Sequence, residues 1–375
     1  MYKRQAYRRA LVAVPTDVEA GAALAGLLDA GKRQELSVAV EQDVRRALEP
    51  DPTDPSLLRA LATAARWRGD KALATAVLGV LVAIGEAQEE ELEQLSADTE
   101  VLRRLGPTQR ALSDGRLSDL RLPGVDGPTL ELAQLATETL LEIDRLEPST
   151  FGFARGDVVN PKSPPPVAQE LGGIASLLGA PPGDVWIGGK DPQLLSAIPS
   201  YKGKPAWLAG AAIGAPLATQ RRYEAGRWAT ALRLGLGPLA ARGADQGATA
   251  LFAIASAAGA SLPAFEGRAG MADATRAATK AMSRRVRKGV PELVQKIGDG
   301  GRPIATFAIA AQRTFARGGL LIAGDLPTVL EVVIGRAPDR TAVCANETAL
   351  DLVRFWISPA ALASRRELGL LPGAS

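Results

Sequence analysis

The residue types that most often carry catalysis are scarce in this chain. It contains no histidine, so the usual general acid and base near neutral pH is missing. Serine–histidine–aspartate triads, cysteine–histidine pairs and zinc sites with imidazole ligands are excluded for the same reason. The single cysteine, Cys344, excludes an intrachain disulfide, and we expect it to be a small buried side chain. An enzyme that uses carboxylates alone stays open as an alternative, although acidic residues are few after residue 148.

The stretch with the most suggestive order of elements begins at a predicted strand, Asp184–Gly188. The apolar segment Trp207–Ile213 is expected to pair with that strand, and a helix is predicted over Thr219–Leu236. A later predicted helix contains QRTFA at Gln312–Ala316, directly before RGGLL at Arg317–Leu321. This order, a small sheet followed by two such helices, resembles that of the gluzincin metallopeptidases.

The resemblance implies specific roles for five positions. Gluzincins carry HExxH on one helix, which puts two histidines on one face with a glutamate between them that holds the attacking water. In this sequence Arg227 and Ala231 fall at the histidine positions and Trp228 at the glutamate. Gln312 falls at the acidic zinc ligand of the later helix, and Ala316 at its aspartate. The resemblance therefore implies a vestigial cleft without a metal or another cofactor, in which Arg227 could hold a carboxylate.

A purely structural interpretation of the same helix stays open. Ala225, Gly226, Ala229 and Ala231 are small residues that would suit a close helix contact in an unrelated helical domain. Both interpretations predict a protein that does not hold zinc as a peptidase does.

The N-terminal residues 1–85 carry a second pattern. Two triplets share similar spacing, Tyr7–Ala10–Pro15 and Val44–Ala47–Pro52, and Gly69 is expected to turn the chain between two further helices. The composite pattern resembles tetratricopeptide repeats. It implies stacked helical hairpins whose concave face binds a peptide or a partner protein. The alternative is that this face only packs against the rest of the chain.

Charge is unevenly divided along the chain. Residues 1–147 hold 18 basic and 25 acidic side chains, whereas residues 148–375 hold 26 basic and 16 acidic ones. The acidic segment Glu86–Glu100 is predicted to be a solvated helix. It opens a linker region, residues 86–160, that leads to the peptidase-like domain at residues 161–375.

The segment Arg276–Lys288, RAATKAMSRRVRK, has six basic residues and no acidic one, and it is predicted to be a single helix. Such a helix could attach to nucleic acid or to an anionic membrane through Arg284, Arg285, Arg287 and Lys288. The segment has no aromatic residues for base stacking, so a solvated face is the preferred interpretation.

The sequence therefore predicts a mostly α protein: repeat-like helical hairpins, a linker, and a helical pseudo-metallopeptidase-like domain with a small sheet. The preferred function is a non-catalytic scaffold or adaptor with a protein partner. The longest apolar run, Ala248–Ala264, contains Pro263 and is too short to span a membrane. No signal peptide is evident, so we expect a cytoplasmic protein, and a natural start upstream of Met1 stays open as an alternative.

Overall fold

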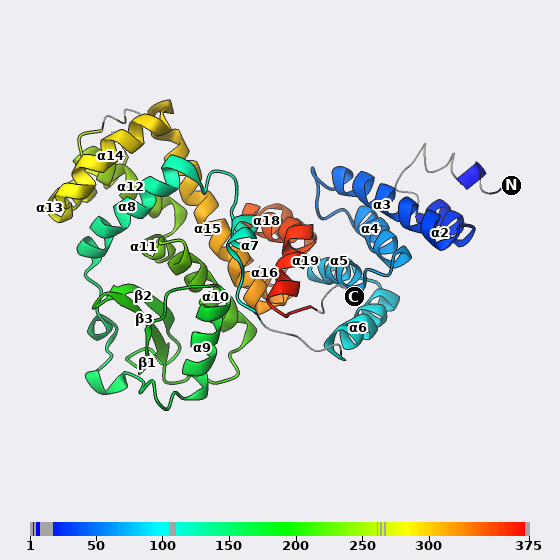
Figure 1. Ribbon diagram of the computed structural model, residues 1–375, viewed down its shortest axis with the longest axis horizontal. Coiled ribbons are helices and arrows are strands. Elements are labelled where there is room, and N and C mark those ends of the chain that lie inside the picture. The colour runs from blue at the N-terminus through cyan, green and yellow to red at the C-terminus, as the bar shows by residue number, and fades with distance from the viewer. Residues whose placement is uncertain are drawn as a thin grey trace. The chain divides into compact units, whose positions relative to one another are not determined.

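The computed structural model describes residue 3 and residues 5–7, 18–104, 110–260, 262, 265 and 268–371 (Figure 1). Helices make up most of these residues, and the described strands form one three-stranded sheet, which confirms the mostly α fold class. The chain forms two compact units. Unit 1 comprises residues 1–110 and 324–375, and unit 2 comprises residues 111–323. Ala10 and Pro15 of the first repeat signal lie outside the described residues.

Unit 1 is entirely helical in its described part. Its helices are α2 (Val18–Gly26), α3 (Ala30–Ala47), α4 (Pro55–Trp67), α5 (Lys71–Ala83), α6 (Glu89–Arg104), α16 (Leu326–Ile334), α17 (Arg340–Cys344), α18 (Glu347–Trp356) and α19 (Pro359–Glu367). Aspartates cap three of the N-terminal ones: the side chains of Asp29, Asp54 and Asp70 accept backbone N–H groups at the starts of α3, α4 and α5. Gly69, with φ of 77°, turns the chain between α4 and α5, as the sequence predicts.

Two arginines join the C-terminal helices of unit 1 to its N-terminal ones. Arg45 Nη1, from α3, donates to the carbonyl oxygen of Ile357 at the end of α18, at 2.9 Å. Arg354 Nη2, from α18, donates to the carbonyl oxygen of Glu49 just after α3, at 3.3 Å. Each arginine therefore satisfies a main-chain acceptor beyond the end of the other helix.

The domain boundaries expected at residues 85 and 160 do not coincide with the two units. Helix α6 belongs to unit 1, and residues 324–375 return to that unit instead of closing the second domain. Residues 324–375 contact the N-terminal helices through bonds such as the hydrogen bond between Arg45 and Ile357, which are 312 residues apart. No local sequence pattern reports a contact of that range.

The expectation of a buried Cys344 is wrong. This cysteine is exposed at the end of the short helix α17, and its Sγ lies 3.2 Å from Thr53 Oγ1. The helix buries Ala342 and Val343 instead, so the cysteine falls on the opposite side of the last turn.

Unit 2 combines the sheet with the remaining helices. Its elements are α7 (Asp114–Leu120), α8 (Gly127–Asp144), η1 (Pro148–Phe151), η2 (Arg155–Asp157), α9 (Pro166–Leu177), β1 (Asp184–Gly188), β2 (Leu195–Tyr201), β3 (Lys204–Gly210), α10 (Thr219–Arg233), α11 (Gly237–Ala240), α12 (Ala244–Ala257), α13 (Met271–Ala281), α14 (Arg284–Ile297), η4 (Asp299–Gly301) and α15 (Arg302–Ala323). Figure 1 shows the sheet at one end of this unit and α13 and α14 at the other.

The sheet has the strand order β1-β3-β2, with β1 parallel and β2 antiparallel to β3. One face packs Trp186, Ile198 and Leu208 against Phe153. Trp207, which alternates with Leu208 along β3, is buried on the other face. The sheet is therefore covered on both sides. In the described residues no helix is long and apolar enough to cross a lipid bilayer.

Candidate functional site: the α10–α15 contact and the basic surfaces

Helices α10 and α15 lie very close together because glycines face one another. A Cβ atom on Gly318 would lie 1.8 Å from Thr230 Oγ1, and one on Gly226 would lie 2.9 Å from the carbonyl oxygen of Gly318. Thr230 is itself buried, and its hydroxyl donates to the carbonyl oxygen of Gly226 at 2.8 Å. Gly226 therefore has the contact role that the structural interpretation of this helix predicts.

Arg227 and Gln312, the two polar residues at predicted zinc-ligand positions, meet between these helices. Arg227 Nη2 donates to Gln312 Oε1 at 3.1 Å. Gln312 Nε2 in turn donates to the carbonyl oxygens of Leu239 at 2.6 Å and Arg242 at 2.7 Å. The amide has a donor on one side and two acceptors on the other, so its orientation is fixed. A glutamate here would face two carbonyls without a hydrogen to donate.

The other predicted positions do not join this network. Ala231, one turn after Arg227, and Ala316 are buried, and Trp228 is partly buried. Burial raises the pKa of the nearby Tyr223, and this effect outweighs the opposite influence of the Arg227 guanidinium, which lies 5.9 Å from the ring centroid. Among the described residues, no group of three histidine, cysteine or acidic side chains could hold a metal ion. The contact is thus suited to structural support.

Helix α10 is held at both ends by residues of neighbouring helices. Near its start, Glu170 of α9 accepts from Arg222 Nε at 2.8 Å and from the backbone nitrogen of Leu217 at 2.7 Å. After its end, Gln134 Nε2 of α8 donates to the carbonyl oxygen of Leu234 at 2.9 Å. These bonds position Arg227 against α15.

The basic stretch is divided between two helices, and the single helix predicted over residues 276–288 is wrong. Met282 is extended, and the Ser283 hydroxyl caps α14 by accepting from the backbone nitrogen of Val286 at 3.3 Å. Serine is a preferred N-cap residue, so the sequence did contain the signal for a break.

Four cations project from the first half of α14. Arg284, Arg285, Arg287 and Lys288 are all exposed, whereas Val286 on the opposite face is buried. Within the part of the chain that the structure describes, none of the four forms an ion pair. Cations in the first turn also oppose the helix dipole, which favours acidic residues there. This surface therefore carries unneutralised positive charge.

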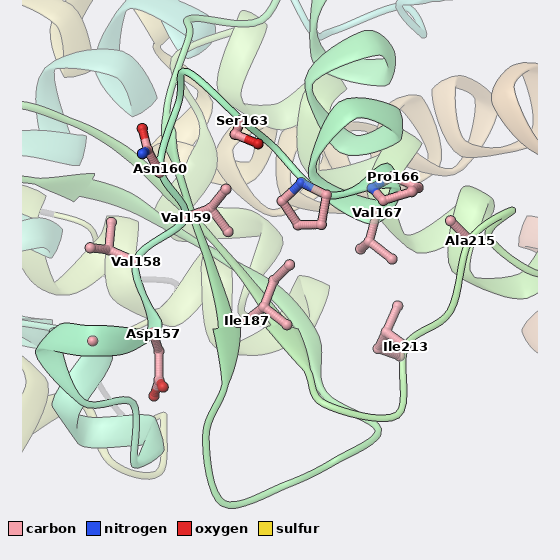
Figure 2. Close-up of a pocket in the computed structure, with 12 residues that line it drawn as sticks. Asp157, Val158, Val159, Asn160, Ser163, Pro166, Val167, Ile187, Ile213 and Ala215 are labelled. Carbon is pink, nitrogen blue, oxygen red and sulfur yellow. The ribbon is translucent and has the colours of Figure 1, made fainter.

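Unit 2 also contains an open, mostly apolar pocket of about 530 Å³. In Figure 2 the side chains of Val159, Val167, Ile187 and Ile213 turn toward a common space. Asp157 lies at the periphery, where one carboxylate oxygen accepts from the backbone nitrogen of Ala154 at 2.7 Å. A single carboxylate among apolar groups suits binding of an apolar side chain better than acid–base chemistry.

A second pocket of unit 2, of about 350 Å³, lies between α8, α12 and α13. Its acidic residue Asp245 pairs with Arg268, and its Arg242 Nη2 lies 2.5 Å from Asp144 Oδ1. The carboxylates near this pocket are therefore neutralised by arginines.

In unit 1 a small groove of about 230 Å³ separates the ends of α3 and α18. Leu48, Pro52 and Ile357 provide apolar surface, and Arg45, Arg354 and the acidic Glu49 provide charged groups. The sequence did not predict this groove, because its two sides come from opposite ends of the chain.

No protein-family model, curated protein or solved structure matches this chain. The resemblances to tetratricopeptide repeats and to gluzincin peptidases therefore remain predictions from the residues themselves.

Proposed function

We propose that this protein is a non-catalytic scaffold or adaptor that binds a protein partner through the helices of unit 1. The observation that carries the proposal is the hydrogen bonding of Gln312. A peptidase would place a zinc-binding carboxylate at this position, whereas this chain uses an amide bonded to Arg227 and to two main-chain carbonyls. A group committed to three structural bonds is not available for chemistry.

The surface of unit 1 supports the binding role. The groove between α3 and α18 combines apolar side chains with two guanidinium groups, a combination that suits peptide and protein recognition. Leu27, which follows α2, and Val38 on α3 expose 50% and 40% of their surfaces. These side chains add apolar contact area on the N-terminal helices.

The test is capture of a partner by the full-length chain, because unit 1 needs both ends of the sequence. We expect a stoichiometric protein partner to be retained by the wild type and lost on Leu27→Glu or Val38→Glu. Ile309→Glu is the matched control, since Ile309 is an equally exposed aliphatic residue on unit 2, at 45%. Failure to retain any partner, or equal retention by all three variants, contradicts the proposal.

Attachment to an anionic surface through α14 is a second candidate, supported by the unneutralised charge of Arg284, Arg285, Arg287 and Lys288. Such binding would weaken as salt rises, because neutralising phosphates releases counterions. The triple variant Arg284→Glu, Arg285→Glu, Arg287→Glu should lose binding to DNA or to anionic vesicles. Binding that is insensitive to salt and to these changes contradicts this candidate.

A further inference from the structure

Among the described residues, Arg365 of α19 is a buried cation for which no acidic side chain serves as counterion. It exposes only 9% of its surface, and its guanidinium carbon lies 4.0 Å from the centroid of the Trp356 ring. In the described part of the chain its Nε is buried without a hydrogen-bond acceptor. Trp356 is fixed beneath it, since the indole Nε1 donates to the carbonyl oxygen of Ala76 in α5 at 3.1 Å.

A guanidinium in this setting strongly favours an added anion. Burial, together with the positive charge of Arg366, lowers the pKa of Arg365 to about 10, so the side chain is still protonated at neutral pH. Buried charges in proteins are normally paired, because an unpaired one has lost its hydration without compensation. The stacking on Trp356 leaves the edge of the guanidinium plane, where two parallel N–H groups match an oxyanion.

The neighbouring charges of unit 1 leave Arg365 unsatisfied. Arg366 Nη2 lies 3.6 Å from Asp70 Oδ1, and the other oxygen of Asp70 lies 3.0 Å from Arg68 Nη2. Arg68 also pairs with Glu41, which in turn holds Arg45 at 2.7 Å. The carboxylates of Asp70 and Glu41 are thus already paired with Arg366, Arg68 and Arg45, and none of these pairs includes Arg365.

We infer that Arg365, stacked on Trp356, is a binding site for an oxyanion, and that the occupant is an acidic side chain of the protein partner. The inference rests on the proposed function of unit 1 and adds the chemistry of the partner to it. Arg45 continues the same row of charges to the groove between α3 and α18. Because Arg45 and Arg354 already donate to main-chain carbonyls and Glu49 lines the groove, the acidic side chain is expected to pair with Arg365 itself.

The test uses the full-length chain with two probes, an acetylated tetraglutamate peptide and inorganic phosphate. We expect the peptide to shift the indole N–H resonance of Trp356, assigned with Trp356→Phe, and to raise the thermal unfolding midpoint in a saturable way. Arg365→Leu should weaken binding by about 10- to 100-fold, the effect of losing a hydrogen bond to a charged group. Arg336→Leu, which changes an exposed arginine of the same unit, should bind like the wild type.

Each outcome decides the matter. Binding of phosphate but not of peptide, lost on Arg365→Leu, assigns the site to phosphoryl groups and overturns the acidic occupant. Equal binding by wild type and Arg365→Leu, or no binding of either probe, overturns the site itself. If Arg365→Leu fails to fold, the Trp356 resonance of the wild type and the conservative Arg365→Lys variant still give the answer.

The result is distinguishable from a failure of the proposed function. If the Arg365→Leu variant still captures the partner as the wild type does, the scaffold role is supported and the Arg365 site is contradicted. If the wild type binds the peptide through Arg365 but retains no protein partner, the Arg365 site is supported and the scaffold role is contradicted.

Discussion

Substitution of Gly226 by alanine tests the α10–α15 contact on which the interpretation of Arg227 and Gln312 depends. The added Cβ would lie 2.9 Å from both the carbonyl oxygen of Gly318 and the Cα of Gly319, and 3.0 Å from the Cβ of Ile322. Two of these atoms belong to the backbone of α15, so no rotamer change can relieve the overlap. The helices must move apart.

Two opposing effects set the change in the free energy of unfolding that Gly226→Ala causes. Forcing an extra carbon into a packed contact costs about 1–3 kcal/mol. Replacing a helical glycine by alanine gains about 0.5–1 kcal/mol, because the unfolded chain loses freedom. The difference between these ranges is about 0–2.5 kcal/mol, so we expect Gly226→Ala to destabilise unit 2 by about 1 kcal/mol. Gly172→Ala in α9, where a Cβ meets no atom within 4 Å, should instead stabilise it by the full alanine gain.

Urea unfolding followed by circular dichroism gives the stability, and native-state hydrogen exchange of peptides from α10 and α15 assigns the change to unit 2. Faster exchange in both helices is expected for Gly226→Ala and slower or unchanged exchange for Gly172→Ala. If Gly226→Ala stabilises the protein as much as the control does, α10 and α15 are not in contact at this position. The placement of Arg227 beside Gln312 would then be refuted.

Three further predictions concern single side chains. Gln312→Glu should destabilise unit 2 by about 1–3 kcal/mol in urea unfolding at pH 7, because two carbonyls lose their donor; a more stable variant would contradict the role of the amide. Burial raises the pKa of Asp51, but hydrogen bonds from Thr53 and the hydrogen bond and positive charge of Arg340 outweigh it and hold the pKa below that of an unfolded aspartate. The contribution of Asp51 to the free energy of unfolding is therefore present above the unfolded pKa and lost as the pH falls through the folded pKa. Asp51→Asn should thus reduce the loss of stability seen in acid titration, and an unaltered titration would contradict this. Trp356→Phe should destabilise unit 1 by about 1–2 kcal/mol and speed hydrogen exchange in α5, because the Ala76 carbonyl loses its second donor and the ring becomes smaller, whereas unchanged exchange would refute that packing.

Local patterns were sufficient for much of unit 2. The strand Asp184–Gly188 has the predicted bounds, and α10 begins at the predicted Thr219. Strand β2 was not predicted, and it contains Pro199, a residue type that argues against a strand interior. Proline is tolerated here because β2 is at an edge of the sheet.

Contacts between distant segments could not be predicted in the same way. The reciprocal bonds of Arg45 and Arg354 join residues more than 300 positions apart, so neither periodicity nor capping signals report them. The same is true of Arg365, whose burial depends on α5 and α18 together. The meeting of Arg227 and Gln312 was accessible only through the resemblance to a peptidase, since 85 residues separate them.

The zinc content of the full-length chain tests the central claim most directly. The protein is incubated with excess zinc, free metal is removed, and bound metal is measured by elemental analysis. The hydrogen bonding of Gln312 predicts no stoichiometric zinc in the wild type and no difference on Gln312→Ala. One zinc ion per chain, lost on Gln312→Ala or Arg227→Ala, would contradict a non-catalytic site.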